Sequence, residues 1–195
     1  MHQNDTAIRA KHASGELVID PPPEDIQFQP ASLDLRLGNE FFVFHRPLGR
    51  PEVIQPIDPE EGFPEKWGER IVADEFVLVD DFILATTLET VRVPADWVAR
   101  VEGRSSLGRL GLIVHATAGF VDPGFEGQIT LEMFNLNPRP IRLRAGMRIC
   151  QLAFETMSGP PARPYGHPEL RSKYQGQRGV TPSRLHLEVR TRVPA

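Results

Sequence analysis

The sequence predicts a mainly β protein, an antiparallel barrel or sandwich of short strands with one short helix at the amino terminus. Short apolar runs recur along the chain, and residues 32–37 alternate apolar and polar side chains with the period of two that a half-buried strand requires. The 19 prolines and 16 glycines fall mostly between these runs, where they mark turns. Many short strands separated by frequent turns are typical of antiparallel barrels and sandwiches.

The helix comes first in the chain. Asn4 or Asp5 can cap its amino terminus, the helix runs toward Ser14, and Gly15 ends it. After it the chain is expected to form strands, because each apolar run is short and bounded by turn residues. The predicted strands cover residues 32–37, 40–45, 70–72, 76–79, 82–85, 90–93, 97–101, 128–134, 141–144 and 148–154.

Two segments differ from this pattern. Residues 46–69 are rich in proline and charge, which indicates a surface excursion within the domain. Residues 158–195 have little apolar periodicity, so we expect a mobile tail unless a ligand or a neighbouring subunit orders it. The 195 residues are expected to form a single domain, residues 1–195, that includes this tail.

Composition argues against several classes of protein. A formal net charge of -4 argues against a nucleic-acid-binding surface, so any anion site must be local. No 18-residue apolar stretch predicts a membrane span, and the amino terminus lacks the features of a secretion signal. Cys150 is the only cysteine, which excludes an internal disulfide framework and fits a reducing cytoplasm. Its apolar neighbours indicate a buried core residue.

Residues 103–112 (GRSSLGRLGL) carry the strongest chemical signal in the sequence. Arg104 and Arg109 supply planar guanidinium groups that fit phosphate oxygens. Ser105 and Ser106 supply hydroxyl groups and a helix N-cap, where exposed backbone N–H groups attract anions. By itself this segment predicts a site for a polyanion and nothing more specific.

Five segments in order resemble the motifs of one enzyme family. Residues 103–112, 117–125 and 128–132 are similar to the active-site motifs of the deoxycytidine triphosphate (dCTP) deaminases, within the trimeric dUTPase superfamily. Residues 30–38 resemble the early strand motif of that family, and residues 172–179 resemble its motif that closes over the nucleotide. The resemblance implies a distorted β-barrel of the dUTPase-like type with a flexible C-terminal lid. It also implies a homotrimer with active sites at the subunit interfaces.

Deamination at cytosine C4 needs an activated water and a group that moves protons. Zinc deaminases activate the water with a metal held by a His/Cys/Cys or Cys₃ set, and a chain with one cysteine lacks that signature. The sequence therefore predicts no zinc. Glu132 matches the family's catalytic glutamate, and a positioned carboxylate can take a proton from water and return it to the base.

The resemblance also assigns the substrate contacts. Ser105, Arg109 and Asp122 complete the catalytic set with Glu132. The backbone of Ala118 is expected to help hold the water, Asp122 to meet the 3′-hydroxyl, and the tail residues to cover the phosphates. Magnesium is expected to be bound mainly through those phosphates. The substrate-binding residues implied are Arg104, Ser105, Ser106, Leu107, Gly108, Arg109, Ala118, Asp122, Thr130, Leu131, Glu132, Gln151, Tyr165, Lys173 and Gln177.

The family divides into members that release dUTP and members that also cleave the triphosphate to dUMP. Deaminase-only members commonly carry a basic pair where this chain has Gly119 and Phe120, which resembles the dUMP-forming branch. Replacing bulky cations with glycine could admit a second water near the α-phosphorus, with Asp122 orienting it. His115 matches a position beside the pocket where the end product dTTP inhibits some members, which makes it a candidate for regulation or a structural histidine.

Three other functions stay open on the sequence. A monofunctional dCTP deaminase would release dUTP, a pure dUTP diphosphatase would share the barrel and the aspartate, and a nucleotide-binding module would lack catalysis. Intact Glu132, Ser105, Arg109 and Asp122 argue against the module. The form of residues 103–109 together with Glu132 favours deamination over dUTP hydrolysis alone.

Overall fold

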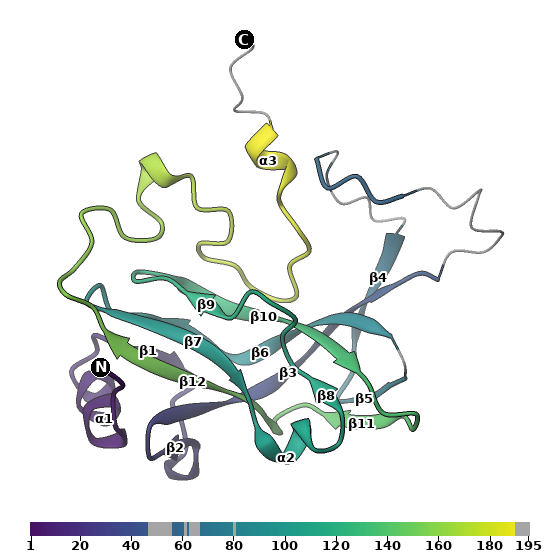
Figure 1. The fold of residues 1–195 in the computed structure, drawn as a ribbon, viewed down its shortest axis with the longest axis horizontal. Helices are drawn as coiled ribbons and strands as arrows, with labels where there is room; N and C mark the ends of the chain where they lie inside the picture. Colours follow the sequence, from purple (N-terminus) through teal and green to yellow (C-terminus); the bar gives the residue numbers. More distant parts are fainter. Residues whose placement is uncertain (47–55, 61, 63–66, 80, 190–195) are drawn as a thin grey trace.

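The computed structural model describes residues 1–46, 56–60, 62, 67–79 and 81–189, so most of the predicted surface excursion at 46–69 lies outside the described residues (Figure 1). None of the described helices has the length and apolar character needed to span a bilayer. The elements in chain order are α1 (Asp5–Ala13), β1 (Val18–Asp20), η1 (Asp25–Gln27), β2 (Phe28–Gln29), β3 (Ser32–Phe44), β4 (Gly68–Val72), β5 (Glu75–Leu78), β6 (Phe82–Arg92), β7 (Trp97–Gly103), α2 (Ser105–Gly108), β8 (Leu112–Ile113), β9 (Phe120–Val121), β10 (Glu126–Asn135), β11 (Ile141–Arg144), β12 (Arg148–Thr156), η4 (Pro168–Leu170) and α3 (His186–Val189).

One curled antiparallel sheet of ten strands forms the body of the protein (Figure 1). Its strand order is β8-β10-β6-β3-β12-β7-β9, with β1 paired to β6, and β2 and β4 paired to β3. Strands β5 and β11 form a separate two-stranded sheet. Leu35, Phe41, Leu131 and Phe154 are fully buried in the core, as is Cys150. The curled sheet confirms the predicted mainly β fold of the distorted-barrel type.

Helix α1 begins and ends where the sequence predicts. The Asn4 side chain accepts a hydrogen bond from the Ala7 N–H at 2.9 Å, and Ser14 forms the C-cap. Ile8 on the inner face of the helix is fully buried. Capping therefore sets the limits of this helix, and Ile8 identifies its inner face.

Two pairs of predicted strands are each continuous in the structure. The strands expected at 32–37 and 40–45 form the single strand β3, whose register against β6 shifts between Leu37 and Phe41. At this shift a Cβ atom on Gly38 would lie 2.8 Å from Thr86 Cγ2, so glycine allows β3 and β6 to approach closely. Gly38 thus lies at an irregularity within one strand rather than between two.

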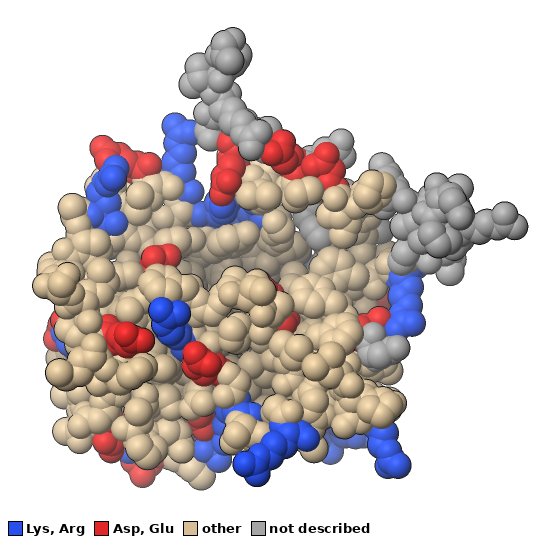
Figure 2. Space-filling model, viewed as in Figure 1, with Lys and Arg blue, Asp and Glu red and all other residues tan. Residues whose placement is uncertain are grey.

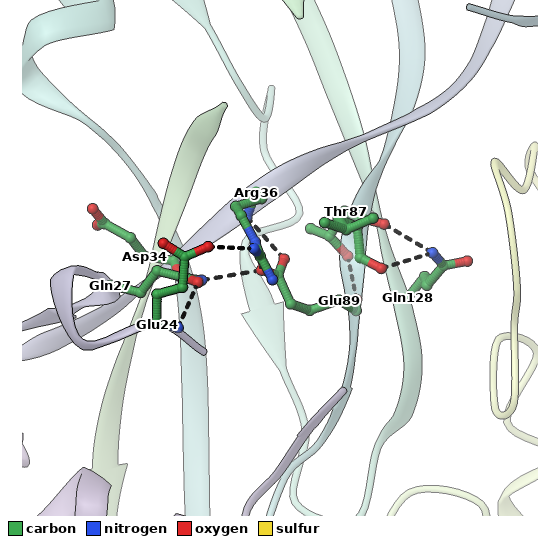
Figure 3. A network of polar contacts seen from close by, with 8 residues as sticks. Glu24, Gln27, Asp34, Arg36, Thr87, Glu89 and Gln128 are labelled. Carbon is green, nitrogen blue, oxygen red and sulfur yellow. Dashed lines mark hydrogen bonds and ion pairs between the residues drawn. The ribbon is translucent and has the colours of Figure 1, made fainter. Parts of the chain in front are cut away.

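The strands expected at 82–85 and 90–93 likewise merge into β6. The residues between these two predicted strands include the polar Thr86, Thr87 and Glu89, which are buried within β6. Glu89 is fully buried and accepts hydrogen bonds from Arg36 Nε at 2.7 Å and from Gln27 Nε2 at 3.0 Å (Figure 3). A buried charge is tolerated when it is paired and hydrogen-bonded. The network therefore lets polar residues continue a central strand.

The C-terminal segment, residues 158–188, leaves β12 and returns across β9 and β10 (Figure 1). Tyr165 of this segment packs against Phe125, with ring centroids 5.9 Å apart, and Val180 is fully buried against Phe42 and Leu84. The Gln128 N–H donates to the Gln177 carbonyl at 3.1 Å, so the segment also bonds to the edge of β10. The predicted mobility of this tail stays a prediction.

Candidate active site

A cleft of about 1500 Å³ opens between the curled sheet and the C-terminal segment. Residues from β9, the following turn, β10 and the C-terminal segment line it. The predicted site residues among its walls are Ala118, Phe120, Asp122, Thr130, Glu132, Tyr165, Lys173 and Gln177. The fold thus brings the middle motif, the glutamate and the tail motif into one space, although they are far apart in sequence.

Glu132 faces this cleft because β10 alternates its side chains. Its neighbours Leu131 and Met133 are fully buried in the core, which places Glu132 on the opposite face of the strand. Glu132 Oε2 accepts hydrogen bonds from the Ala116 N–H at 3.2 Å and the Thr117 N–H at 3.4 Å. Two backbone donors therefore hold one carboxylate oxygen and fix the orientation of the carboxylate.

Asp122 lies at the tight turn after β9. Gly124 in this turn has φ +85°, and a Cβ atom there would lie 2.8 Å from Pro164 Cβ, so the turn packs closely on the C-terminal segment. Desolvation by the surrounding protein raises the pKa of the Asp122 carboxyl. Burial also raises the pKa of Tyr165, and the negative charge of Asp122 contributes to that rise. The aspartate and the tyrosine therefore lie near each other in the cleft.

The polar groups of the tail are engaged within the chain. Gln177 Nε2 donates to the Gln128 carbonyl at 2.6 Å, while Gln177 Oε1 is buried without a hydrogen-bond partner in the described part of the chain. The Thr181 N–H donates to Thr130 Oγ1 at 3.3 Å. Lys173 Nζ forms an ion pair with Glu188, a residue of α3. The predicted phosphate contact Lys173 is thus held by an internal carboxylate in this conformation.

The arginine-serine segment does not line this cleft. Arg104 ends the extended run of β7, so α2 begins at Ser105, and Arg104 itself is the N-cap residue without a side-chain capping bond. The expectation that Ser105 or Ser106 caps the helix is therefore wrong, because both lie inside its first turn. The side chains of Ser105, Ser106 and Arg109 are exposed, and Gly108 is exposed as well.

Gln151 lies with this second group. Its Oε1 accepts from Ser32 Oγ at 2.7 Å, and its Nε2 donates to the Gly103 carbonyl at 3.0 Å. Leu107 and Leu131 are buried in the core. The predicted site residues therefore divide into a cleft group around Glu132 and a separate group around α2.

Three comparisons with known proteins bear on this arrangement. The family model described as dCTP deaminase-like matches residues 3–157. This chain belongs to the dCTP deaminase-like family. It is 47% identical over 187 residues to "dCTP deaminase, dUMP-forming" of Methanobrevibacter smithii, covering 95% of each chain.

A second relative with the same name matches to a similar degree. The chain is 48% identical over 190 residues to "dCTP deaminase, dUMP-forming" of Dictyoglomus thermophilum, covering 95% of each chain. Among solved structures, the 2′-deoxycytidine 5′-triphosphate deaminase of Agrobacterium tumefaciens superposes with a TM-score of 0.61 at 27% identity. That match covers 80% of this chain and 48% of the solved chain, so this chain spans about half of that protein.

Gly119 and Phe120, the candidate branch residues, differ in their surroundings. Gly119 packs against His115, whose Nδ1 is buried without a partner among the described residues. Phe120 is exposed over 53% of its surface, and the Arg100 guanidinium carbon lies 5.2 Å from its ring centroid. Of the two residues, only Phe120 lines the cleft.

The structure connects Asp34 and Arg148 to the second group, and the sequence assigned no role to either residue. Asp34 is buried, and Arg104 Nε and Arg148 Nη1 lie 3.2 Å and 3.0 Å from its Oδ2. The strand pattern assigned Asp34 to the polar face of β3, and its place in the family-like early motif was the only available signal. In the described part of the chain, no group of three or more His, Cys, Asp or Glu is arranged to hold a metal.

Proposed function

We propose that this chain catalyses the zinc-independent hydrolytic deamination of dCTP and then cleaves the triphosphate, giving dUMP, ammonia and diphosphate. The observation that carries the proposal is the Glu132 carboxylate, oriented into a large cleft by two backbone N–H groups and accompanied there by Asp122. Membership of the dCTP deaminase-like family supports the substrate. The names of the relatives in Methanobrevibacter smithii and Dictyoglomus thermophilum support the product.

The first step adds water across the N3–C4 double bond of the cytosine, with the oxygen bonding to C4. Glu132 takes a proton from the attacking water and delivers it to N3, and a further proton transfer lets the amine leave as ammonia. The step converts dCTP and water into dUTP and ammonia. Because one oxygen of Glu132 is fixed by backbone donors, its other oxygen is available to handle these protons.

A complete site requires a second subunit. The exposed Ser105 and Arg109 do not line the cleft that contains Glu132, yet the family resemblance places both in the catalytic set with it. The exposed Leu110 and Leu136, at 50% and 64%, offer apolar surface close to α2. A homotrimer, in which α2 of one subunit completes the cleft of its neighbour, accounts for both features.

The second step adds water to the α-phosphorus and releases diphosphate, so dUTP and water give dUMP and diphosphate. Asp122 is the residue that would orient this water, while also meeting the 3′-hydroxyl. Magnesium would be held mainly by the substrate phosphates, a role that suits an ion keeping several water ligands. The carboxylates of the cleft would meet such an ion through water.

The remaining assignments extend the same site. Tyr165, Lys173 and Gln177 would cover the phosphates once Lys173 exchanges Glu188 for a phosphate. His115 would contribute to inhibition by dTTP. The single domain of residues 1–195 with its closing tail, and a cytoplasmic location, complete the proposal.

Product analysis tests the function. Purified enzyme incubated with dCTP and Mg²⁺ should yield dUMP, ammonia and diphosphate, resolved by chromatography. Accumulating dUTP without dUMP would show a monofunctional deaminase, and turnover of dUTP but not dCTP would show a diphosphatase. Glu132→Gln should abolish ammonia release while dCTP binding is retained, and surviving turnover would overturn the assignment of Glu132.

A further inference from the structure

Asp34 holds two arginines at one carboxylate oxygen. Its side chain is 2% exposed, and its Oδ2 lies 3.0 Å from Arg148 Nη1 and 3.2 Å from Arg104 Nε. Arg104 Nη1 also donates to the Arg148 carbonyl at 2.9 Å. Arg148 Nη1 donates to the Ile26 carbonyl at 3.0 Å. Arg104 is therefore held at Nε and Nη1, and Arg148 at Nη1.

The arrangement contains more positive charge than the burial of Asp34 requires. One arginine can satisfy a carboxylate through two parallel hydrogen bonds, so a single pair would be sufficient to bury Asp34. Here one carboxylate faces two guanidinium groups, which leaves a net charge of about +1 and places like charges close together. Burial raises the pKa of Asp34, and the two arginines act against that rise. A polyanion would relieve this repulsion.

Both guanidinium groups keep N–H donors that are free to bind. Arg104 and Arg148 are 25% and 28% exposed. Within the described residues, neither Arg104 Nη2 nor Nε and Nη2 of Arg148 has a hydrogen-bond partner. Arg148 therefore has its whole Nε–Nη2 edge open and Arg104 has Nη2 open, and groups held in place in this way are preorganised for phosphate oxygens.

This pair lies beside the second group of site residues. Arg104 directly precedes α2, and Gln151 pairs in register with Asp34 across β12 and β3. Lys and Arg side chains gather at the lower edge of the molecule in Figure 2, where Figure 1 places α2. The pair therefore lies at the end of the protein that carries Ser105 and Arg109.

We propose that Arg148 is a second phosphate-binding arginine beside Arg104, and that Asp34 is the positioning residue that directs both guanidinium groups toward the triphosphate. The proposal rests on the proposed function, since it adds to the phosphate end of the dCTP site. Asp34 does not contact substrate. Its effect is transmitted through the two arginines that it holds.

The experiment uses the full chain and inorganic triphosphate as the probe. Arg148→Gln should weaken the binding of inorganic triphosphate by about tenfold and raise KM for dCTP by a similar factor, because hydrogen bonds to charged groups are lost. We expect kcat for ammonia release to stay within about twofold of the parent, since the proposed contact of Arg148 is with the phosphates and not with the reacting base. Arg148→Lys should recover part of the affinity, because it keeps the charge and loses the planar fork.

The control is Arg144→Gln, which removes the same charge on β11 and leaves Glu75 paired with Arg142. Asp34→Asn should raise KM more than Arg148→Gln does, because it releases both arginines. If Arg148→Gln binds inorganic triphosphate as tightly as Arg144→Gln does, the proposed phosphate-binding role of Arg148 is refuted, whatever the thermal stability of the variant. Arg148→Gln could lose triphosphate binding while the parent enzyme does not turn over dCTP. That result would support phosphate binding by Arg148 and refute the proposed function.

Discussion

Gly119 lies against the imidazole ring of His115. A Cβ atom built on Gly119 would lie 2.9 Å from His115 Cε1 and 2.9 Å from the Val101 carbonyl oxygen. The backbone has little room to withdraw, because the Gly119 carbonyl accepts a hydrogen bond from the Val101 N–H at 2.7 Å. The candidate branch residue Gly119 is thus in contact with His115, the candidate residue for regulation.

Gly119→Ala should displace the His115 ring and shift the products from dUMP toward dUTP. The added methyl group cannot be accommodated without moving a ring or a backbone segment, which costs about 1–3 kcal/mol of stability. The ratio of dUMP to dUTP in a dCTP time course measures the effect. Gly159→Ala is the matched control, because a Cβ atom there meets nothing within 4 Å. An unchanged product ratio in Gly119→Ala would argue that this contact has no part in the second step.

The second step should depend on pH through Asp122. Burial raises the pKa of this carboxyl above the ordinary aspartate value of about 4. Because the carboxylate is the form that orients water, dUMP formation should fall as the pH drops through that raised pKa. The pH profile of kcat/KM for diphosphate release reports the group in the free enzyme. Asp122→Asn should remove this acid limb along with most dUMP formation, and an unaltered limb would assign it to another group.

Glu89→Gln should destabilise the fold strongly. Glu89 is fully buried and accepts hydrogen bonds from the side chain and the backbone N–H of Arg36. Glutamine lacks the negative charge of Glu89, so the largely buried guanidinium group of Arg36 would lose a buried counter-charge. Breaking one partner of a buried pair costs about 3–5 kcal/mol. Thermal unfolding at a fixed protein concentration measures the loss. Glu75→Gln, which affects an exposed pair with Arg142, should cost less than about 1 kcal/mol.

Val180→Ala should loosen the C-terminal segment while the sheet stays folded. Val180 is the fully buried apolar contact between the segment and Phe42 and Leu84, and its truncation removes about 2 kcal/mol of local packing. Limited trypsin digestion should then cut faster after Lys173 and Arg178, and KM for dCTP should rise. Thr181→Ala keeps the buried valine and serves as the control. Equal digestion rates for the two variants would show that Val180 does not anchor the segment.

The short elements with strong local signals could be predicted from the sequence. Asn4 and Ser14 bound α1 because capping is a local interaction, and residues 141–144 form β11 with the predicted bounds. The strand predicted over residues 128–134 lies within β10. In each case the signal lies within a few neighbouring residues, which is the range over which capping and periodicity act.

The sequence by itself determined the chemical inventory of this protein: the mainly β pattern, the arginine-serine segment, and the carboxylates Glu132 and Asp122. Only the tertiary structure decided which of these residues meet. It joined two predicted strands through buried Thr86, Thr87 and Glu89, separated Arg109 from the cleft of Glu132, and connected Asp34 to Arg104 and Arg148. The physical reason is that a polar side chain can be buried only where distant strands supply its partners, and a local sequence pattern does not identify those partners.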